Sequence, residues 1–391
     1  MGYDFDIRVD RSNMASIREL AMPKEVKQAG LISCWGAEFE FKTAPFLVQA
    51  IKDWADKGLA AYCTEDEELQ NVIKKWMKMH RDWEIETDWI VPTYGLTCSV
   101  ATICRAFTEP GDGIIGLGPV YHMTWEAVEL NGRIHIDCPL LFDGENYAID
   151  YERLELLFAK PENKVFTFCN PHNPIAKVWG REDLVRIAKL AVKYDKIVYS
   201  DEIFADTVYE GVEMLTFDQV AEQPFPWIVA TSLGKTFSMT GIGQANLIIR
   251  DEKLREQFVK QRNIDHYGSF NPMMRAAYFA GYTEEGSSWV KEMMEYCYQN
   301  YRYLDNFFRE NIPQMKVIKP DGTYILWVDC RGFGLYQPEE YEALFRKGGF
   351  ACDEGSRYGS EPGFIRMNLA APRRELEKVM ESLQKSMLER K

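Results

Sequence analysis

The sequence contains no apolar stretch long enough to cross a bilayer, and it has no excess of positive charge. Its longest apolar stretches are short and interrupted by charged residues, well below the roughly 20 residues that a membrane-spanning helix needs. Lysine and arginine number 46 against 60 aspartate and glutamate residues, which gives a formal charge of −14. A nucleic-acid-binding surface usually requires a basic face. The composition therefore argues against both a membrane protein and a nucleic-acid-binding protein.

Two further absences concern export and metal binding. The N-terminus, Met1 to Asp6, is acidic and lacks the apolar core of a signal peptide. The nine cysteines include no Cys-x-x-Cys pair, so we expect free thiols in a cytoplasmic protein. The five histidines show no metal-ligand spacing, and the sequence therefore predicts no dedicated metal site.

Two nucleotide-binding patterns are incomplete. Gly111 to Gly116 matches G-x-G-x-x-G, but Glu109-Pro110 precedes it, and a strand rather than a helix lies across it. We interpret it as a turn that enters a strand. Gly234-Lys235-Thr236 resembles the end of a phosphate-binding P-loop, but Val229 stands where that motif needs its first glycine.

The middle of the chain alternates apolar β-branched runs with amphipathic helical patterns. Arg181 to Lys193 has apolar residues at positions 184, 187, 188, 191 and 192, which is a helical spacing. The predicted strands are Val165–Cys169, Lys196–Ser200, Trp227–Thr231 and Ala245–Ile249. This alternation predicts an α/β fold, with a mostly parallel sheet covered by helices on both faces.

The end of the chain has a different pattern, which predicts a smaller α+β domain. Its predicted elements are long helices over Gly286–Asn311 and Arg373–Arg390, and strands over Thr323–Val328 and Gly363–Asn368. The length of 391 residues fits two or three structural units. We expect an N-terminal segment, 1–45, that packs with the small domain, a large domain over 46–285 and the small domain over 286–391.

Three polar side chains follow predicted parallel strands. Asn173 comes after the predicted strand Val165–Cys169, Asp201 directly follows Lys196–Ser200, and Lys235 follows Trp227–Thr231. Ligands bind outside the carboxyl ends of the strands in open parallel sheets, so these side chains could converge. A lysine can form a Schiff base with the aldehyde of pyridoxal phosphate, and an aspartate can keep its pyridine nitrogen protonated. Asn173 would then hold the phenolic oxygen of the ring. From spacing alone, Asp201 could instead be a helix cap and Lys235 a solvated surface residue.

These residues, in this order and spacing, resemble the fold-type I enzymes that depend on pyridoxal phosphate, the class I/II aminotransferase superfamily. Within that superfamily the chain is similar to the MalY/PatB branch of cystathionine β-lyases and carbon–sulfur lyases. The similarity runs from Trp35 to the terminal helix. It implies Lys235 as the Schiff-base lysine and catalytic residue, Asp201 as the pyridinium partner and Asn173 as a ring and substrate contact.

The resemblance implies further binding residues. Gly95, Leu96 and Thr97 match the phosphate-binding turn, and Ser232 fits another phosphate contact. Tyr121 matches the aromatic residue that stacks on the ring, and Tyr62 matches a tyrosine that reaches the phosphate of a neighbouring subunit, which implies a homodimer. Arg366 matches the arginine that binds the substrate α-carboxylate. The alternatives are a core role for Tyr121, a surface role for Tyr62, a structural salt bridge for Arg366 and a helix cap for Thr97.

The chain also departs from the family pattern. Asn173-Pro174-Ile175-Ala176 replaces Asn-Pro-Thr-Gly, which alters the turn at Asn173, and Gly234 replaces a serine next to Lys235. Gly243 stands where many relatives carry arginine or lysine.

The resemblance implies a carbon–sulfur β-lyase that cleaves an L-amino acid to thiol, pyruvate and ammonia. Transamination, or a specialised biosynthetic reaction on an amino acid, would use the same residues. A regulatory binding protein is the third hypothesis, and it would tolerate substitution of Lys235.

Overall fold

The computed structural model describes residues 2–59, 61–267, 271–334, 337–348, 351–360 and 362–388. The chain divides into two compact units. Unit 1 comprises Met1–Lys42, Pro174–Ala176 and Lys291–Lys391, and unit 2 comprises Thr43–Asn173 and Lys177–Val290.

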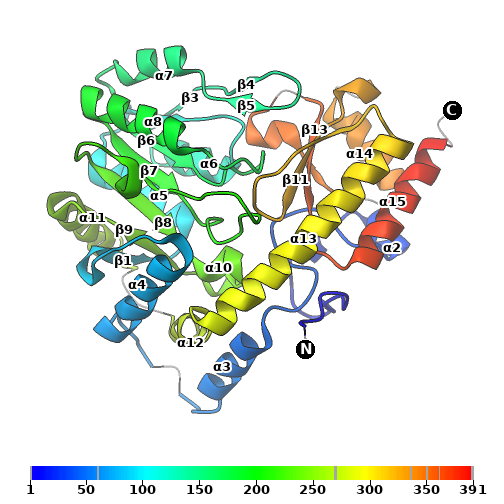
Figure 1. Cartoon of the computed structure of the whole chain (residues 1–391), viewed down its shortest axis with the longest axis horizontal. Helices are drawn as coiled ribbons and strands as arrows, with labels where there is room; N and C mark the ends of the chain where they lie inside the picture. The colour runs from blue at the N-terminus through cyan, green and yellow to red at the C-terminus, as the bar shows by residue number, and fades with distance from the viewer. Residues whose placement is uncertain are drawn as a thin grey trace. The chain divides into compact units, whose positions relative to one another are not determined.

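Unit 2 is built around a seven-stranded sheet with the strand order β1-β9-β8-β7-β6-β2-β3 (Figure 1). The strands are β1 (Ile90–Thr93), β2 (Gly113–Gly116), β3 (Ile134–Asp137), β6 (Asn163–Cys169), β7 (Ile197–Asp201), β8 (Trp227–Thr231) and β9 (Ala245–Ile248), and β4 (Leu141–Phe142) pairs with β5 (Tyr147–Ala148) in a separate hairpin. Strand β9 runs antiparallel to both of its neighbours, and the other pairs are parallel. Strand β1 consequently runs in the same direction as β8. The predicted mostly parallel sheet is confirmed.

Helices cover both faces of this sheet. The α-helices that lie wholly within unit 2 are α3 (Pro45–Ala55), α4 (Glu67–Arg81), α5 (Leu96–Phe107), α6 (His122–Leu130), α7 (Tyr151–Phe158), α8 (Arg181–Tyr194), α9 (Phe217–Val220), α10 (Leu233–Thr236), α11 (Glu252–Ile264) and α12 (Pro272–Gly281). Alternate residues of a strand point to opposite faces. Val165 of β6 therefore joins a core with α5, α6 and α11, whereas Phe166 packs on Phe158 of α7 at a ring distance of 5.2 Å.

Two predictions about unit 2 gain detail from the structure. Four of the five apolar positions predicted for α8 are buried, but Val192 is 38% exposed. The interpretation of the Gly111–Gly116 pattern is confirmed, since Gly111 has a φ of +92° in a turn and β2 begins two residues later.

Unit 1 contains a four-stranded antiparallel sheet with the order β10-β11-β13-β12. Its strands are β10 (Lys316–Ile318), β11 (Ile325–Asp329), β12 (Asp353–Glu354) and β13 (Phe364–Asn368), and its helices are α1 (Ile17–Ala21), α2 (Lys24–Ala29), α14 (Pro338–Lys347) and α15 (Arg373–Leu388). The long helix α13 (Glu284–Asn311) crosses the boundary between the units at Val290. The predicted end of α15 at Arg390 lies outside the described residues.

Strand β11 begins two residues later than the sequence predicts. Thr323 has a φ of +63°, a left-handed conformation that is incompatible with a strand and rare for a β-branched residue. Its hydroxyl accepts a hydrogen bond from the backbone N–H of Ile325 at 3.0 Å, which stabilises the turn.

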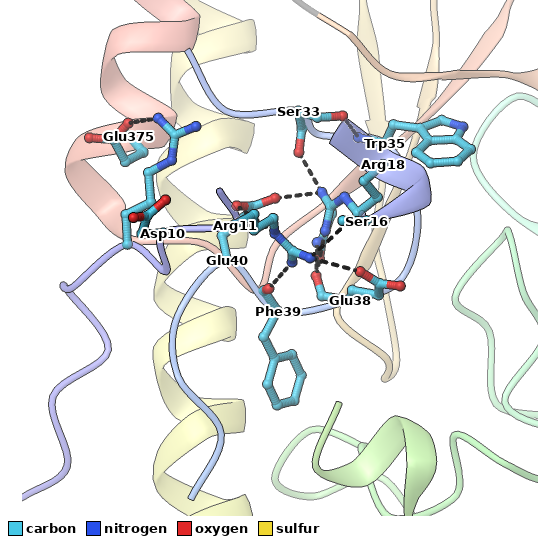
Figure 2. A network of polar contacts seen from close by, with 12 residues as sticks. Asp10, Arg11, Ser16, Arg18, Ser33, Trp35, Glu38, Phe39, Glu40 and Glu375 are labelled. Atoms are coloured by element: carbon cyan, nitrogen blue, oxygen red, sulfur yellow. Dashed lines mark hydrogen bonds and ion pairs between the residues drawn. The ribbon is translucent and has the colours of Figure 1, made fainter. Parts of the chain in front are cut away.

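The N-terminal segment of unit 1 is held by a buried ion pair. Arg18 and Glu40 are 2% and 3% exposed, and Nη2 of Arg18 lies 2.8 Å from Oε1 of Glu40 (Figure 2). The same guanidinium donates to the backbone oxygens of Ser33 and Glu38. Burial raises the pKa of Glu40, and the neighbouring arginines lower it.

Replacing Arg18 with methionine should destabilise the protein by about 3 kcal/mol, because it leaves the Glu40 carboxylate buried without its close partner. Urea unfolding measures this loss. The double variant Arg18→Met/Glu40→Leu should recover most of it, since neither charge then remains buried. Lys78→Ala, at an exposed ion pair with Asp82, is the control and should leave the unfolding curve unchanged. A loss for Arg18→Met no larger than that of the control would contradict the assignment.

Candidate active site

The common strand direction brings the predicted polar residues to one edge of the large sheet. Strand β6 ends at Cys169, β7 at Asp201 and β8 at Thr231. The register pairs Cys169 with Asp201, and Asp201 with Ala230. The segments that carry Asn173, Asp201 and Lys235 therefore leave three adjacent strands at the same edge.

Asp201 has an unusually high proton affinity. Burial raises its pKa to about 7, although the backbone N–H of Ile203 and the charge of Lys235 both lower it. The Ile203 N–H donates to Oδ1 of Asp201 at 3.3 Å, which is a long hydrogen bond. The contacts within unit 2 thus stabilise the negative charge of Asp201 only weakly against its burial. A cationic ring N–H is the kind of partner that would stabilise this charge.

A second carboxylate, Glu202, lies next to Asp201 and is paired with an arginine. It forms a buried ion pair with Arg81 of α4, and it accepts hydrogen bonds from Ser200 at 2.8 Å and Thr216 at 3.1 Å. Its negative charge is one of the causes that raise the pKa of Asp201. Glu202 therefore belongs to the supporting structure of unit 2.

Lys235 projects from α10, a single helical turn that opens directly after β8. Ser232 caps this turn, since its Oγ accepts from the N–H of Gly234 at 3.0 Å and donates to the Gln244 oxygen at 2.8 Å. The ammonium of Lys235 lies 5.9 Å from the ring centroid of Phe204. Because the Ser232 hydroxyl already donates to Gln244, its predicted contact with a phosphate would have to share or replace that bond.

Sequence reasoning missed Asp206, which fixes α10. Its Oδ2 accepts from the Thr236 hydroxyl at 2.8 Å and from the Trp76 indole at 3.1 Å. It thereby ties the residue after Lys235 to helix α4. The sequence places Asp206 five residues after Asp201 but does not indicate which groups it contacts, and the folded structure shows these contacts.

The turn after β6 carries Asn173, which is 7% exposed. A second asparagine, Asn170, is fully buried and accepts from the N–H of Trp179 at 2.9 Å. His172 and Lys177 close the turn with a backbone hydrogen bond of 2.7 Å. Ala176 adopts a φ of +56°, a left-handed conformation that glycine would take without strain.

The N-terminus of α5 opens at the same edge, because β1 runs parallel to β8. Gly95 precedes it with a φ of +97°, and no side chain caps the first turn. A Cβ on Gly95 would meet no atom within 4 Å, so the backbone there borders open space. Thr97 is exposed and Leu96 is half-buried. An uncapped helix N-terminus suits an anionic phosphate.

The remaining candidates of unit 2 differ in exposure. Tyr121 is half-buried at the start of α6, and Tyr62 is 100% exposed. Gly243 has a φ of +64°, and a Cβ there would lie 3.0 Å from the ring of Tyr94. The Tyr94 ring therefore occupies the space that a side chain at position 243 would need.

Arg366 belongs to unit 1. It is 4% exposed and forms an ion pair with Asp353. The alternative interpretation of Arg366 as a partner in a salt bridge thus describes one of its contacts, while its role toward a substrate stays a prediction.

Comparisons with known proteins agree with the predicted resemblance. The model of the family "Aminotransferase class I and II" matches residues 37–383. Cystathionine beta-lyase PatB of Bacillus subtilis (strain 168) is 30% identical over 368 residues, covering 93% of this chain and 95% of PatB. Protein MalY of Escherichia coli (strain K12) is 26% identical, covering 96% of each chain. The crystal structure of cystalysin from Treponema denticola, which contains a pyridoxal 5'-phosphate cofactor, has a TM-score of 0.93 and 33% identity, with both chains fully covered.

Replacing Asp201 with asparagine should change how the stability of the cofactor-free protein depends on pH. The folded pKa of about 7 lies above the usual 3.8, so the folded state holds a proton that the unfolded state releases between these values. This contribution to stability is present at low pH and is lost as the pH rises toward 7. Between pH 5 and pH 8, the wild type should lose about 2–3 kcal/mol more than Asp201→Asn in urea unfolding. Equal losses for both proteins would refute the burial argument.

Proposed function

This chain belongs to the aminotransferase class I and II family, and from that premise we propose that it is a carbon–sulfur β-lyase dependent on pyridoxal phosphate. The substrate is an L-amino acid with a sulfur substituent on its β-carbon. The products are a thiol, pyruvate and ammonia. The observation that carries the proposal is the Asp201 carboxylate with its raised pKa, at the edge of the sheet where Lys235 follows the next strand.

The residues of this edge fit the cofactor at both ends. The Asp201 carboxylate would pair with the pyridinium nitrogen, and the uncapped turn of Gly95, Leu96 and Thr97 would hold the phosphate. We assign Asn173 to the phenolic oxygen and Tyr121 to the ring face. The bound cofactor supplies an electron-accepting ring that stabilises negative charge on the substrate α-carbon.

Lys235 is the residue that moves the proton. As a free amine it removes the proton from the α-carbon of the bound substrate, and the sulfur substituent then leaves the β-carbon. The centroid of the Phe204 ring lies 5.9 Å from this amine. Arg366 is assigned to the substrate carboxylate, because a guanidinium forms a bidentate pair with a planar carboxylate. The name of PatB, a cystathionine β-lyase, supports elimination over transamination.

We also propose that the protein acts as a homodimer in the cytoplasm. Tyr62 is 100% exposed in the single chain, as expected of a residue that contacts a neighbouring subunit. All nine cysteines are free thiols, which suits a reducing compartment. In the described part of the chain, no helix has both the length and the apolar character that crossing a membrane requires. The predicted domains, 1–45 with 286–391 and 46–285, stay a proposal that the two compact units support.

The proposed reaction is tested by incubating the protein with pyridoxal phosphate and L-cystathionine in the absence of any keto acid. We expect equal amounts of thiol and pyruvate over many turnovers. Lys235→Ala should lose this activity by at least a thousandfold, and borohydride should no longer fix the cofactor to the protein, as measured by mass spectrometry. Lys193→Ala, at an exposed ion pair with Glu155, is the control.

Two outcomes would contradict the lyase assignment. Turnover that requires a keto acid would indicate an aminotransferase. Full activity in Lys235→Ala would remove that residue as the proton carrier.

Tyr62→Phe should weaken the binding of pyridoxal phosphate at least fivefold without changing stability, because the hydroxyl is assigned to the phosphate of the neighbouring subunit. Fluorescence titration of the cofactor-free protein measures the affinity, and sedimentation equilibrium measures the subunit number. Tyr194→Phe, which removes a hydroxyl bonded to Glu155, is the control. A monomer with unchanged affinity would refute the assignment.

A further inference from the structure

An aspartate lies directly opposite Arg366 in the sheet of unit 1. Strand β12 pairs with β13, and the register places Asp353 opposite Arg366 on the same face. Nε and Nη2 of Arg366 donate to Oδ2 of Asp353 at 2.9 and 2.5 Å. The backbone N–H of Gly36 donates to the same oxygen at 3.2 Å. One edge of the guanidinium is therefore fixed by a buried carboxylate that the N-terminal segment also holds.

The face of the same guanidinium is fixed by an aromatic ring. Its Cζ atom lies 4.8 Å from the ring centroid of Tyr358, in the turn after β12. Tyr358 is 1% exposed and packs edge-on against Trp327, with ring centroids 6.1 Å apart. Because Asp353 fixes an edge and Tyr358 a face, both the position and the plane of the guanidinium are set.

The contact with Asp353 uses the Nε–Nη2 edge of the arginine. Immobilising a long side chain costs conformational entropy, so an arginine that is already held loses less when a ligand binds. Asp353 thus acts on binding through the orientation of Arg366 and not through contact with the substrate.

We propose that Asp353 is a positioning residue, which fixes the orientation of Arg366 so that the enzyme binds the carboxylate of its substrate. This inference rests on the proposed function, in which Arg366 binds that carboxylate. The proposal explains why a buried acid, Asp353, lies beside Arg366, although the ligand assigned to Arg366 is itself an anion. The carboxylate of Asp353 lies on the Nε–Nη2 edge of the guanidinium.

The test compares Asp353→Ala and Asp353→Asn in the holoenzyme. Alanine removes the acceptor, and we expect KM for L-cystathionine to rise at least tenfold while kcat changes less than threefold. Asparagine keeps an acceptor oxygen for Arg366, so its KM should stay within threefold of the wild type. Calorimetric titration with 3-mercaptopropionate, a carboxylate without an amino group, should show the same order of affinities without turnover.

Asp329→Ala is the matched control on the same sheet. Asp329 also accepts from an arginine side chain, from Nε and Nη2 of Arg331 at 2.9 and 2.8 Å. Its loss should reproduce any general destabilisation but leave KM unchanged. Unchanged affinity for 3-mercaptopropionate in Asp353→Ala would overturn the proposal, and tighter binding would overturn it in favour of competition between the two carboxylates. A wild type that binds this acid but releases no thiol would refute the proposed function alone.

Discussion

The strand order around β7 determines where the Asp201 carboxylate is buried, and the candidate site of unit 2 depends on that burial. Strand β7 lies between β6 and β8, so the residue at its end is flanked on both sides by segments that leave neighbouring strands. Strand β9 runs the opposite way, which allows β1 to join the sheet in the direction of β8. As a result the N-terminus of α5 opens at the same edge as Asp201.

Two buried ion pairs act on the candidate site residues, one through local charge and the other through geometry. A buried pair contributes little net stability, because removing both charges from water costs about as much as their attraction returns. Its effect is on geometry and on local charge. Arg81 neutralises Glu202 and so limits the negative potential at Asp201, whereas Asp353 fixes the orientation of Arg366. Glu202 and Asp353 are both acids next to candidate site residues, and neither is assigned to the chemistry.

Continuous apolar runs in the sequence were enough to predict the central strands of the sheet of unit 2. The runs that became β6, β7 and β8 are continuous and apolar because both faces of a covered parallel sheet are buried. The residues that end these runs could therefore be named from the sequence. Asp206 and Asp353 could not, since their partners Trp76 and Gly36 are more than 100 residues away along the chain. Thr323 was also missed, because its propensity favours a strand and a local hydrogen bond overrides it.

The turn that follows Asn173 shows how a departure from the family sequence is accommodated. The sequence predicts an altered turn where Ala176 replaces glycine, since alanine in the left-handed region costs about 1–2 kcal/mol. Ala176 nevertheless has a φ of +56°, and its carbonyl accepts hydrogen bonds from the N–H groups of Asp321 at 2.8 Å and Gly322 at 3.3 Å. Two backbone bonds contribute about as much as the strain costs. Contacts from a distant segment thus keep the left-handed conformation at this position, although alanine replaces glycine there.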